Sequence, residues 1–393
     1  MTIDQTLLDA IDGEWIAQKA EELVCTPSVT LHEQEVCELY TQLLRDLGLT
    51  VDVREVTPGR SNLYASIPGK GNGHTLMLNG HLDTIPNQNN QPCFRDGDLL
   101  YGRGTTDMKG AMASILGTAR AFLETGIQLN GDLVLTAVVG HEEPEAEKDG
   151  PQALIADINS GRTHCDRIII VEGPDALWVM SMGSMVFTIT LDSHQGGTHT
   201  QYVPISENPL RVVGDLLNRL CQFQDELNNT TSHPLAGPER IDLGIVHCGD
   251  YFNRIPRDGT LTGTRRWSPG KEAPAVLAEL QSLCDQVRAE TSHQLHVSME
   301  HEREPFETPV HDPIVAAVSK AHHRVTGTDA ATVGKRIVGD ANLYVHGSQV
   351  PTIYYGPSNE TAHADVENVS LTRLESAAKV YALSALHYCG LAE

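Results

Sequence analysis

The chain alternates between strand-like and helix-like patterns at both of its ends, and this alternation limits the fold more than any other feature. Apolar residues recur at helical spacing over 17–24, 33–47 and 108–124, between strand-like runs at 50–56, 62–67, 74–78 and 132–139. Residues 168–171 form a continuous apolar run, typical of a strand buried on both faces. After residue 312 the pattern resumes, with helices expected at 313–325 and 372–387 and a strand at 352–355. We therefore predict an α/β fold in which helices cover a sheet.

The middle of the chain has a different pattern. Strand-like runs at 186–191, 241–248, 259–265 and 295–300 enclose two helical stretches at 209–227 and 273–289. Four strands with two helices make a compact α+β unit of ordinary domain size. We therefore predict one α/β domain, made of residues 1–182 and 303–393, which is interrupted by a smaller domain at residues 183–302.

Charge and apolar content indicate the kind of partner to expect. The 393 residues include 28 Lys and Arg against 52 Asp and Glu, a net charge of -24 that disfavours nucleic acid and anionic membranes. No basic and apolar leader and no run of about 18 apolar residues is apparent, so we expect no membrane anchor. Eight scattered cysteines without a CxxC pair predict buried free thiols and a cytoplasmic location. A small molecule or a peptide is the expected partner.

His81 and Asp83 lie at the end of an expected strand. They follow the apolar run 75–78, with Leu82 between them. Because side chains alternate along a strand, both point to the same side, where an imidazole can bind a metal while a carboxylate holds its ring. This pair predicts a metal site.

Further acidic and imidazole residues follow other expected strands. Asp107 lies in a glycine-rich turn before the helix at 108–124, and Glu142 and Glu143 follow the strand at 132–139. Adjacent carboxylates repel, which suggests that one binds a cation and the other transfers a proton. A solvated acidic loop is the alternative, since more acidic residues follow.

Glu172 ends the strand at 168–171, and His363 lies in the loop after the strand at 352–355. A surface histidine is the alternative for His363. Ligands gather at the carboxyl ends of strands in open α/β sheets, so we expect these residues to meet. An oxygen-rich set with two imidazoles suits zinc or a similar divalent ion.

Five segments, in order, resemble the M20 family of dinuclear metallohydrolases, which includes acetylornithine deacetylase, succinyl-diaminopimelate desuccinylase, aminoacylase and carboxypeptidase G2. They are Asn-Gly-His-Leu-Asp-Thr at 79–84, Gly-Arg-Gly-x-x-Asp-Met-Lys-Gly at 102–110, Glu-Glu at 142–143, Glu-Gly at 172–173 and Ala-His at 362–363. The resemblance extends through nearly the whole chain. It implies a three-layer catalytic domain and a ferredoxin-like lid domain that also dimerises.

The resemblance also implies a role for each site residue. His81, Asp107 and Glu172 would hold one ion, while Asp107, Glu143 and His363 would hold the other. Asp83 would support His81, and Glu142 would be the general base that acts on a water between the ions. Zinc is the expected metal, with cobalt or manganese as substitutes, and a cis peptide bond is implied after Asp107.

The implied reaction is hydrolysis of an amide bond in a small N-acyl amino acid or a dipeptide-like substrate. In the middle domain, His199 would reach the active site of the partner in a homodimer, with His194 as its rival. Asn253 and Arg266 would grip a substrate carboxylate, since arginine offers paired donors in one plane.

Three departures from the family pattern bear on the substrate. His141 stands where an acidic residue often precedes the paired glutamates, Pro174-Asp175 follow Glu172-Gly173, and Gly339 stands where a serine or threonine is usual. His141 leaves open an aminohydrolase that acts on a small non-peptide amine. A binding protein without activity is a further alternative.

Overall fold

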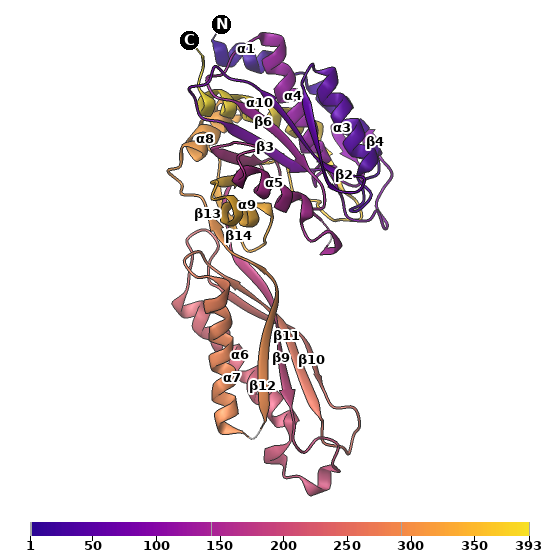
Figure 1. Ribbon diagram of the computed structural model, residues 1–393, viewed down its shortest axis with the longest axis vertical. Coiled ribbons are helices and arrows are strands. Elements are labelled where there is room, and N and C mark those ends of the chain that lie inside the picture. The colour runs from indigo at the N-terminus through magenta and orange to yellow at the C-terminus, as the bar shows by residue number, and fades with distance from the viewer. Residues whose placement is uncertain (1, 143, 292, 393) are drawn as a thin grey trace. The chain divides into compact units, whose positions relative to one another are not determined.

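The computed structural model describes residues 2–142, 144–291 and 293–392, which form two compact units (Figure 1). The first unit combines the chain up to Val179, Thr308–Val333 and the chain from Leu343 onward. The second combines Met180–Glu307 with Gly334–Asn342. The second unit thus also takes in residues 334–342, which the sequence analysis assigns to the α/β domain.

The first unit is built on a mixed sheet. Its strands lie in the order β1 (Val51–Thr57), β2 (Arg60–Ile67), β6 (Leu133–Val138), β3 (Leu76–His81), β7 (Arg167–Ile170), β15 (Thr352–Tyr354) and β8 (Leu177–Ser181). The four neighbours β6, β3, β7 and β15 run parallel. Their carboxyl ends therefore meet at one edge of the sheet.

Helices cover both faces of this sheet (Figure 1). The chain places α1 (Ile3–Asp9), α2 (Gly13–Cys25), α3 (Gln34–Asp46), α4 (Lys109–Thr125), α5 (Asp149–Asn159), α8 (Pro313–Thr326), α9 (Asp340–Ser348) and α10 (Leu371–Cys389) around it. Of these, α2, α4, α8 and α10 pack together, and α4 and α10 lie on β3. On the other face, Asn62 and Tyr64 of β2 hydrogen-bond to α5.

Close packing at the centre of the sheet explains the apolar run in β3 and the glycine that follows it. All six residues of β3 are buried between β6 and β7, which is why the apolar run at 75–78 is continuous. Gly80 lies against α4: a Cβ atom there would lie 2.5 Å from Met108 Cε and 2.5 Å from Met112 Sδ. A small residue at position 80 thus lets the strand and the helix approach each other.

The second unit has the order β9 (Gly183–Asp192), α6 (Pro209–Thr230), β10 (Arg240–Cys248), β11 (Asp258–Trp267), α7 (Ala273–Glu290) and β12 (Gln294–Arg303). Its antiparallel sheet has the order β10-β11-β9-β12, the ferredoxin-like arrangement. Residues of β9 alternate, so that Phe187, Ile189 and Leu191 enter a core with both helices. The predicted fold class, an α/β domain interrupted by an α+β unit, is confirmed.

Short elements complete the chain. A small sheet joins β16 (Asn368–Ser370), β5 (Leu99–Tyr101) and β4 (Phe94–Asp96) beside the glycine-rich turn. The strands β13 (Phe306–Glu307) and β14 (Thr332–Lys335) lie where the chain passes between the units.

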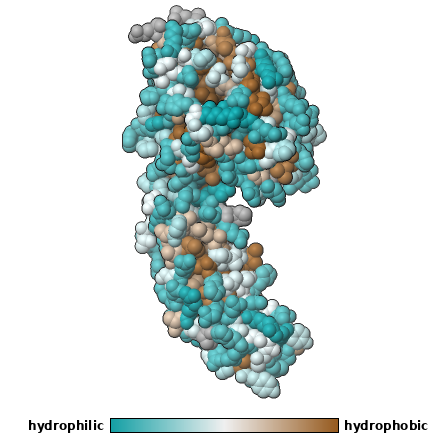
Figure 2. Space-filling model, viewed as in Figure 1, coloured by the Kyte–Doolittle hydropathy of each residue, from teal (hydrophilic) through white to brown (hydrophobic). Residues whose placement is uncertain are grey.

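No helix in the described residues is both long and apolar enough to cross a membrane. The visible face of the molecule is mainly hydrophilic, as the charge leads one to expect (Figure 2).

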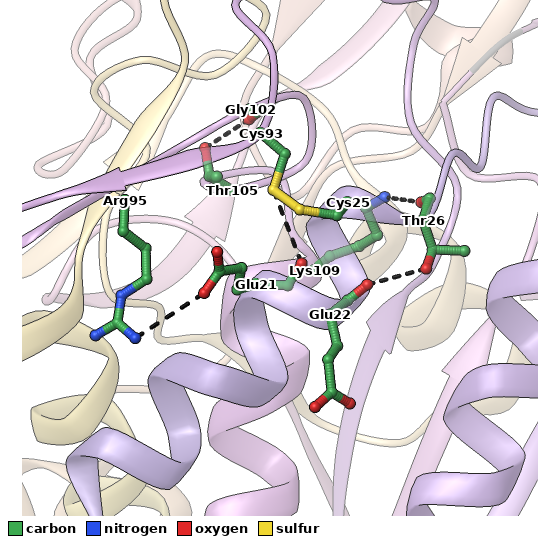
Figure 3. Close-up of a disulfide and its surroundings, with 9 residues drawn as sticks. All are labelled: Glu21, Glu22, Cys25, Thr26, Cys93, Arg95, Gly102, Thr105 and Lys109. Carbon is green, nitrogen blue, oxygen red and sulfur yellow. Dashed lines mark hydrogen bonds and ion pairs between the residues drawn. A yellow bond between two sulfur atoms is a disulfide. The ribbon is translucent and has the colours of Figure 1, made fainter.

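The expectation of free buried thiols is wrong for one pair of cysteines. Cys25, the last residue of α2, forms a disulfide with Cys93, which precedes β4 (Figure 3). Cys221 is a free thiol but exposed. The pair is 68 residues apart and matches no spacing motif, so only the packing of α2 against the β4 region brings it together. The argument from cysteine usage for a reducing compartment therefore no longer holds.

Candidate metal centre

The carboxyl edge of the parallel strands carries the predicted metal-site residues that the structure describes. His81 ends β3, Glu142 follows β6 and Glu172 follows β7. Asp107 lies just before α4, and His363 lies in the loop after β15. Their positions follow from the strand order, because β3 lies between β6 and β7. Glu143, also predicted to be a ligand, lies outside the described residues.

His81 is oriented by a main-chain group. Its Nδ1 lies 2.9 Å from the carbonyl oxygen of Asp83 and 3.7 Å from the Asp83 carboxylate. The Nδ1–H donates to this carbonyl, and Nε2 faces Asp107 Oδ1 at 3.0 Å, so Nε2 is the atom that would bind a metal ion in place of a proton. The carboxylate expected to hold the ring thus lies near it as an ion-pair partner, while the carbonyl of the same residue accepts the hydrogen bond.

Asp107 lies between two imidazoles. His81 approaches its Oδ1, and His363 Nε2 lies 3.3 Å from its Oδ2 and 3.2 Å from Glu142 Oε2. Burial disfavours the charged ring of His81, but the hydrogen bond and charge of Asp107 outweigh this and raise the pKa of His81 to about 10. Hydrogen bonds to Asp107 and Glu142 likewise raise the pKa of His363 to about 10. The negative charge of Asp107 and Glu142 thus stabilises a positive charge on each ring. A divalent cation between these groups would satisfy the same negative charge.

Two groups of side chains have the spacing of a metal site. One comprises His81, Asp107 and Glu142, and the other comprises His81, His141 and Glu172; within each group the ligand atoms lie within 4.8 Å of one another. Imidazole nitrogens with carboxylate oxygens are the donors that zinc and related ions accept. The residues present therefore fit a metal centre, and His81 belongs to both groups.

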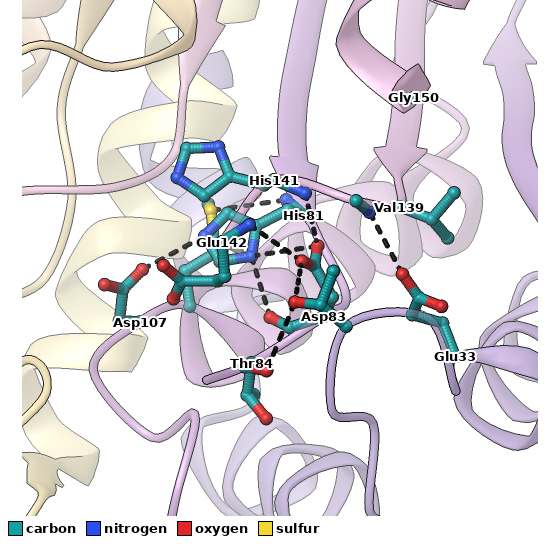
Figure 4. A network of polar contacts seen from close by, with 12 residues as sticks. Glu33, His81, Asp83, Thr84, Asp107, Val139, His141, Glu142 and Gly150 are labelled. Carbon is teal, nitrogen blue, oxygen red and sulfur yellow. Dashed lines mark hydrogen bonds and ion pairs between the residues drawn. The ribbon is translucent and has the colours of Figure 1, made fainter. Parts of the chain in front are cut away.

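The Asp83 carboxylate holds the loop that carries Glu142 (Figure 4). It is fully buried and accepts hydrogen bonds from His141 N at 3.0 Å, Glu142 N at 2.8 Å and Thr30 Oγ1 at 2.8 Å. The carboxylate therefore orients the backbone at Glu142, while the carbonyl of Asp83 orients His81. Asp83 thus links the two residues.

A second buried carboxylate holds the start of the same loop. Glu33 accepts from Gly140 N at 3.1 Å and pairs with Arg60, whose Nε lies 2.8 Å from Glu33 Oε2. Gly140 has φ 68°, and a Cβ atom there would collide with the Asp149 carboxylate, which also binds Arg60. Glycine is therefore required at this turn. The sequence gives no signal for Glu33.

A third buried carboxylate, that of Glu367, holds the turn that carries Asp107. This buried carboxylate accepts from Gly104 N and Thr106 N at 3.0 Å each, from Asp107 N at 3.2 Å, and from Arg103 Nη1 at 2.7 Å. The peptide bond from Asp107 to the next residue is cis, as the family resemblance implies. Glu367 is more than 250 residues away along the chain, so sequence analysis misses it.

We expect Asp83→Asn to weaken both the fold and the activity. An amide presents an NH2 group to main-chain N–H groups that now meet a carboxylate, and a buried donor without an acceptor costs about 1–3 kcal/mol. The free energy of unfolding should fall by about that amount, and kcat by about 10–100-fold, the usual effect of altering a group that holds metal ligands. Urea denaturation and steady-state kinetics measure both, with Asp96→Asn on the exposed strand β4 as control. Unchanged stability and kcat would contradict the role given to this carboxylate.

The predicted residues of the middle domain also lie in a group. His199 Nε2 lies 3.3 Å from Asn253 Nδ2, and the two segments are joined by a hydrogen bond from Thr200 N to the Asn253 carbonyl. Arg266, on β11, donates to the carbonyl of Arg336 at 2.5 Å. His199 and Asn253 are exposed or partly exposed, as is the rival His194. These residues belong to the second unit.

Comparison with known proteins gives the family. Residues 77–387 match Peptidase family M20/M25/M40. The chain belongs to this family. It is therefore an M20 hydrolase, and the matched range contains every residue that the sequence analysis assigned to the metal site.

Relatives of this M20 hydrolase cover more than nine-tenths of its length. It is 26% identical over 383 residues to succinyl-diaminopimelate desuccinylase of Hydrogenovibrio crunogenus, covering 93% of this chain and 96% of the relative. Aminopeptidase PepT of Bacillus cereus has the same fold, with a TM-score of 0.83 at 17% identity over 96% of this chain and 99% of that one. The YXEP protein of Bacillus subtilis, a dinuclear metal-binding peptidase, matches with a TM-score of 0.70 at 16% identity, over 95% and 97% of the two chains.

Proposed function

We propose that this M20 hydrolase cleaves the amide bond of a small N-acyl amino acid or a dipeptide-like substrate with two zinc ions. The observation that carries this proposal is the position of Glu142. Its carboxylate lies beside His363 and within the group formed by His81 and Asp107, and the Asp83 carboxylate fixes its backbone. A carboxylate held at a metal centre is suited to move a proton. The relatives include enzymes named succinyl-diaminopimelate desuccinylase, and this name describes a substrate of this kind.

The proposed ligands are His81, Asp107 and Glu172 for one ion, and Asp107, Glu143 and His363 for the other. When bound, the ions polarise the amide carbonyl and lower the pKa of water. Glu142 takes a proton from the attacking water as the new C–O bond forms, and the amide C–N bond breaks when Glu142 passes that proton to the leaving amine. His81 presents Nε2 to the centre because its Nδ1–H is engaged by the Asp83 carbonyl.

We also propose a homodimer formed through the second unit. The strand β10 lies at the edge of its sheet and exposes Ile245 and Val246. Tyr251 and Phe252, in the turn after it, are 60% and 84% exposed. An unpaired strand edge beside apolar side chains favours pairing with a second copy. In that dimer His199 stabilises the oxyanion in the partner's active site, while Asn253 and Arg266 bind the substrate carboxylate.

A mixture of inactive subunits tests this arrangement. His199→Ala and Glu142→Gln each remove one part of the site, and a mixed dimer keeps one site with both parts intact. We expect the mixture to recover up to about a quarter of wild-type activity after subunit exchange, as statistical pairing dictates. Each variant alone, treated in the same way, is the control. Mixed dimers that are verified by mass and remain inactive would contradict a role for His199 across the dimer.

A substrate panel tests the proposed reaction. Purified enzyme with added zinc is offered N-succinyl, N-acetyl and N-formyl amino acids, dipeptides, and small amines without an amide bond, and the released amine or ammonia is measured. We expect hydrolysis of at least one amide class. Release of ammonia from the non-peptide amines alone would favour an aminohydrolase instead. No turnover in any class would contradict the proposed function.

A further inference from the structure

His141 is the departure from the family pattern that lies nearest to the metal centre. It follows β6 directly and is 8% exposed. Its ring stacks on that of His81, with 4.1 Å between the ring centroids and 7° between the planes (Figure 4). The main chain at this position is fixed, because His141 N donates to the Asp83 carboxylate at 3.0 Å. The main-chain hydrogen bond and the ring stack thus place the His141 imidazole beside the metal centre.

The spacing of His141 fits coordination. Its ring offers a nitrogen within 4.8 Å of a nitrogen of His81 and an oxygen of Glu172. Two nitrogen ligands of one zinc ion lie about 3.4–4.2 Å apart, given a Zn–N distance of about 2.1 Å. Because the lone pair of an imidazole nitrogen lies in the plane of its ring, the His141 ring would have to turn out of the stack to direct a nitrogen at the ion of His81 and Glu172.

We infer that His141 is an additional ligand of the ion held by His81 and Glu172. With the shared Asp107, that ion then has two nitrogen and two oxygen donors from the protein. An acidic residue at position 141 offers an oxygen and a negative charge instead. Imidazole favours zinc, cobalt and nickel, whereas carboxylates suit manganese and magnesium. The residue thus makes this ion site selective for zinc over manganese and leaves it one unit more positive. The inference rests on the proposed function only in sharing its metal centre.

Metal binding without substrate tests the inference. The metal-free full chain is titrated with Zn²⁺ or Mn²⁺ against a chromogenic chelator, and its Co²⁺ form is studied by visible absorption. His141→Phe keeps an aromatic ring to stack on His81 but removes the nitrogen donor. His141→Asp restores an oxygen donor, and His164→Phe, at an exposed position, is the matched control.

We expect His141→Phe to weaken one of the two Zn²⁺ sites about 10–100-fold, to change Mn²⁺ binding less, and to alter the Co²⁺ spectrum. His141→Asp should reduce the preference for Zn²⁺ over Mn²⁺ at least about tenfold. Wild-type affinities and spectra in His141→Phe, or in His141→Asp if the first variant does not fold, would overturn the inference and leave the proposed function intact. A wild-type chain that binds no metal would overturn both.

Discussion

Glu142→Gln is expected to lower kcat by about 10²–10⁴-fold while both metal ions stay bound. The amide keeps the size of the carboxylate and its main-chain hydrogen bond to Asp83, but it cannot accept a proton from water. Glu142 lies 3.2 Å from His363 Nε2, so the substitution also removes a negative charge beside that ring but keeps an oxygen that can accept from it. His363 still faces Asp107, which limits the change to the metal site. Steady-state kinetics and metal analysis of the same preparation measure the two effects.

Glu145→Gln is the matched control for this prediction. Glu145 lies in the same acidic loop but is exposed, so its substitution should leave kcat and metal content near the wild-type values. If Glu142→Gln kept the wild-type kcat on every substrate, the assignment of the general base would be wrong. If it lost metal together with activity, Glu142 would be a ligand instead.

Asp107→Ala is expected to abolish binding of both ions and to lower activity by at least about 10⁴-fold. The carboxylate uses one oxygen toward His81 and the other toward His363, which belong to different proposed metal sites. Its removal takes one negative ligand from each ion and leaves two imidazoles facing each other. Both polarisation of the carbonyl and activation of water depend on the ions. Metal analysis after dialysis and kinetics with saturating zinc test the prediction.

Asp96→Ala is the control, since this aspartate is exposed on β4 and outside the metal centre. Circular dichroism of the metal-free proteins shows whether Asp107→Ala still folds. A folded Asp107→Ala chain with two tightly bound ions would exclude Asp107 as the shared ligand. One ion lost and one retained would assign Asp107 to a single site.

The fold and the positions of the candidate site residues could be predicted because their signals are local. Strand β3 is buried on both faces and therefore starts with a continuous apolar run, and β9 alternates because only one of its faces is buried. His81, Glu142 and Glu172 each follow a strand, and parallel strands bring such residues to one edge. The Asp107 turn could be found through its glycines. Gly104, with φ 87°, is one that the turn requires.

The groups that hold these loops could not be predicted, because their partners are distant in the chain. Glu367 binds the Asp107 turn and Glu33 binds Gly140, over more than 250 and 100 residues respectively. A lone glutamate in a sequence looks like any surface residue, and only tertiary structure shows that it is buried. The disulfide of Cys25 was missed for the same reason.

The central claim is that this chain needs two divalent ions for amide hydrolysis, and metal titration of the metal-free enzyme tests it most directly. The chain is stripped with a chelator, and zinc is returned in steps while hydrolysis of the best substrate of the panel is followed. We predict no turnover without metal and full recovery at two equivalents per chain, with isothermal titration calorimetry giving the same stoichiometry. Full activity of the stripped enzyme, or full recovery at one equivalent with no second site, would contradict the account.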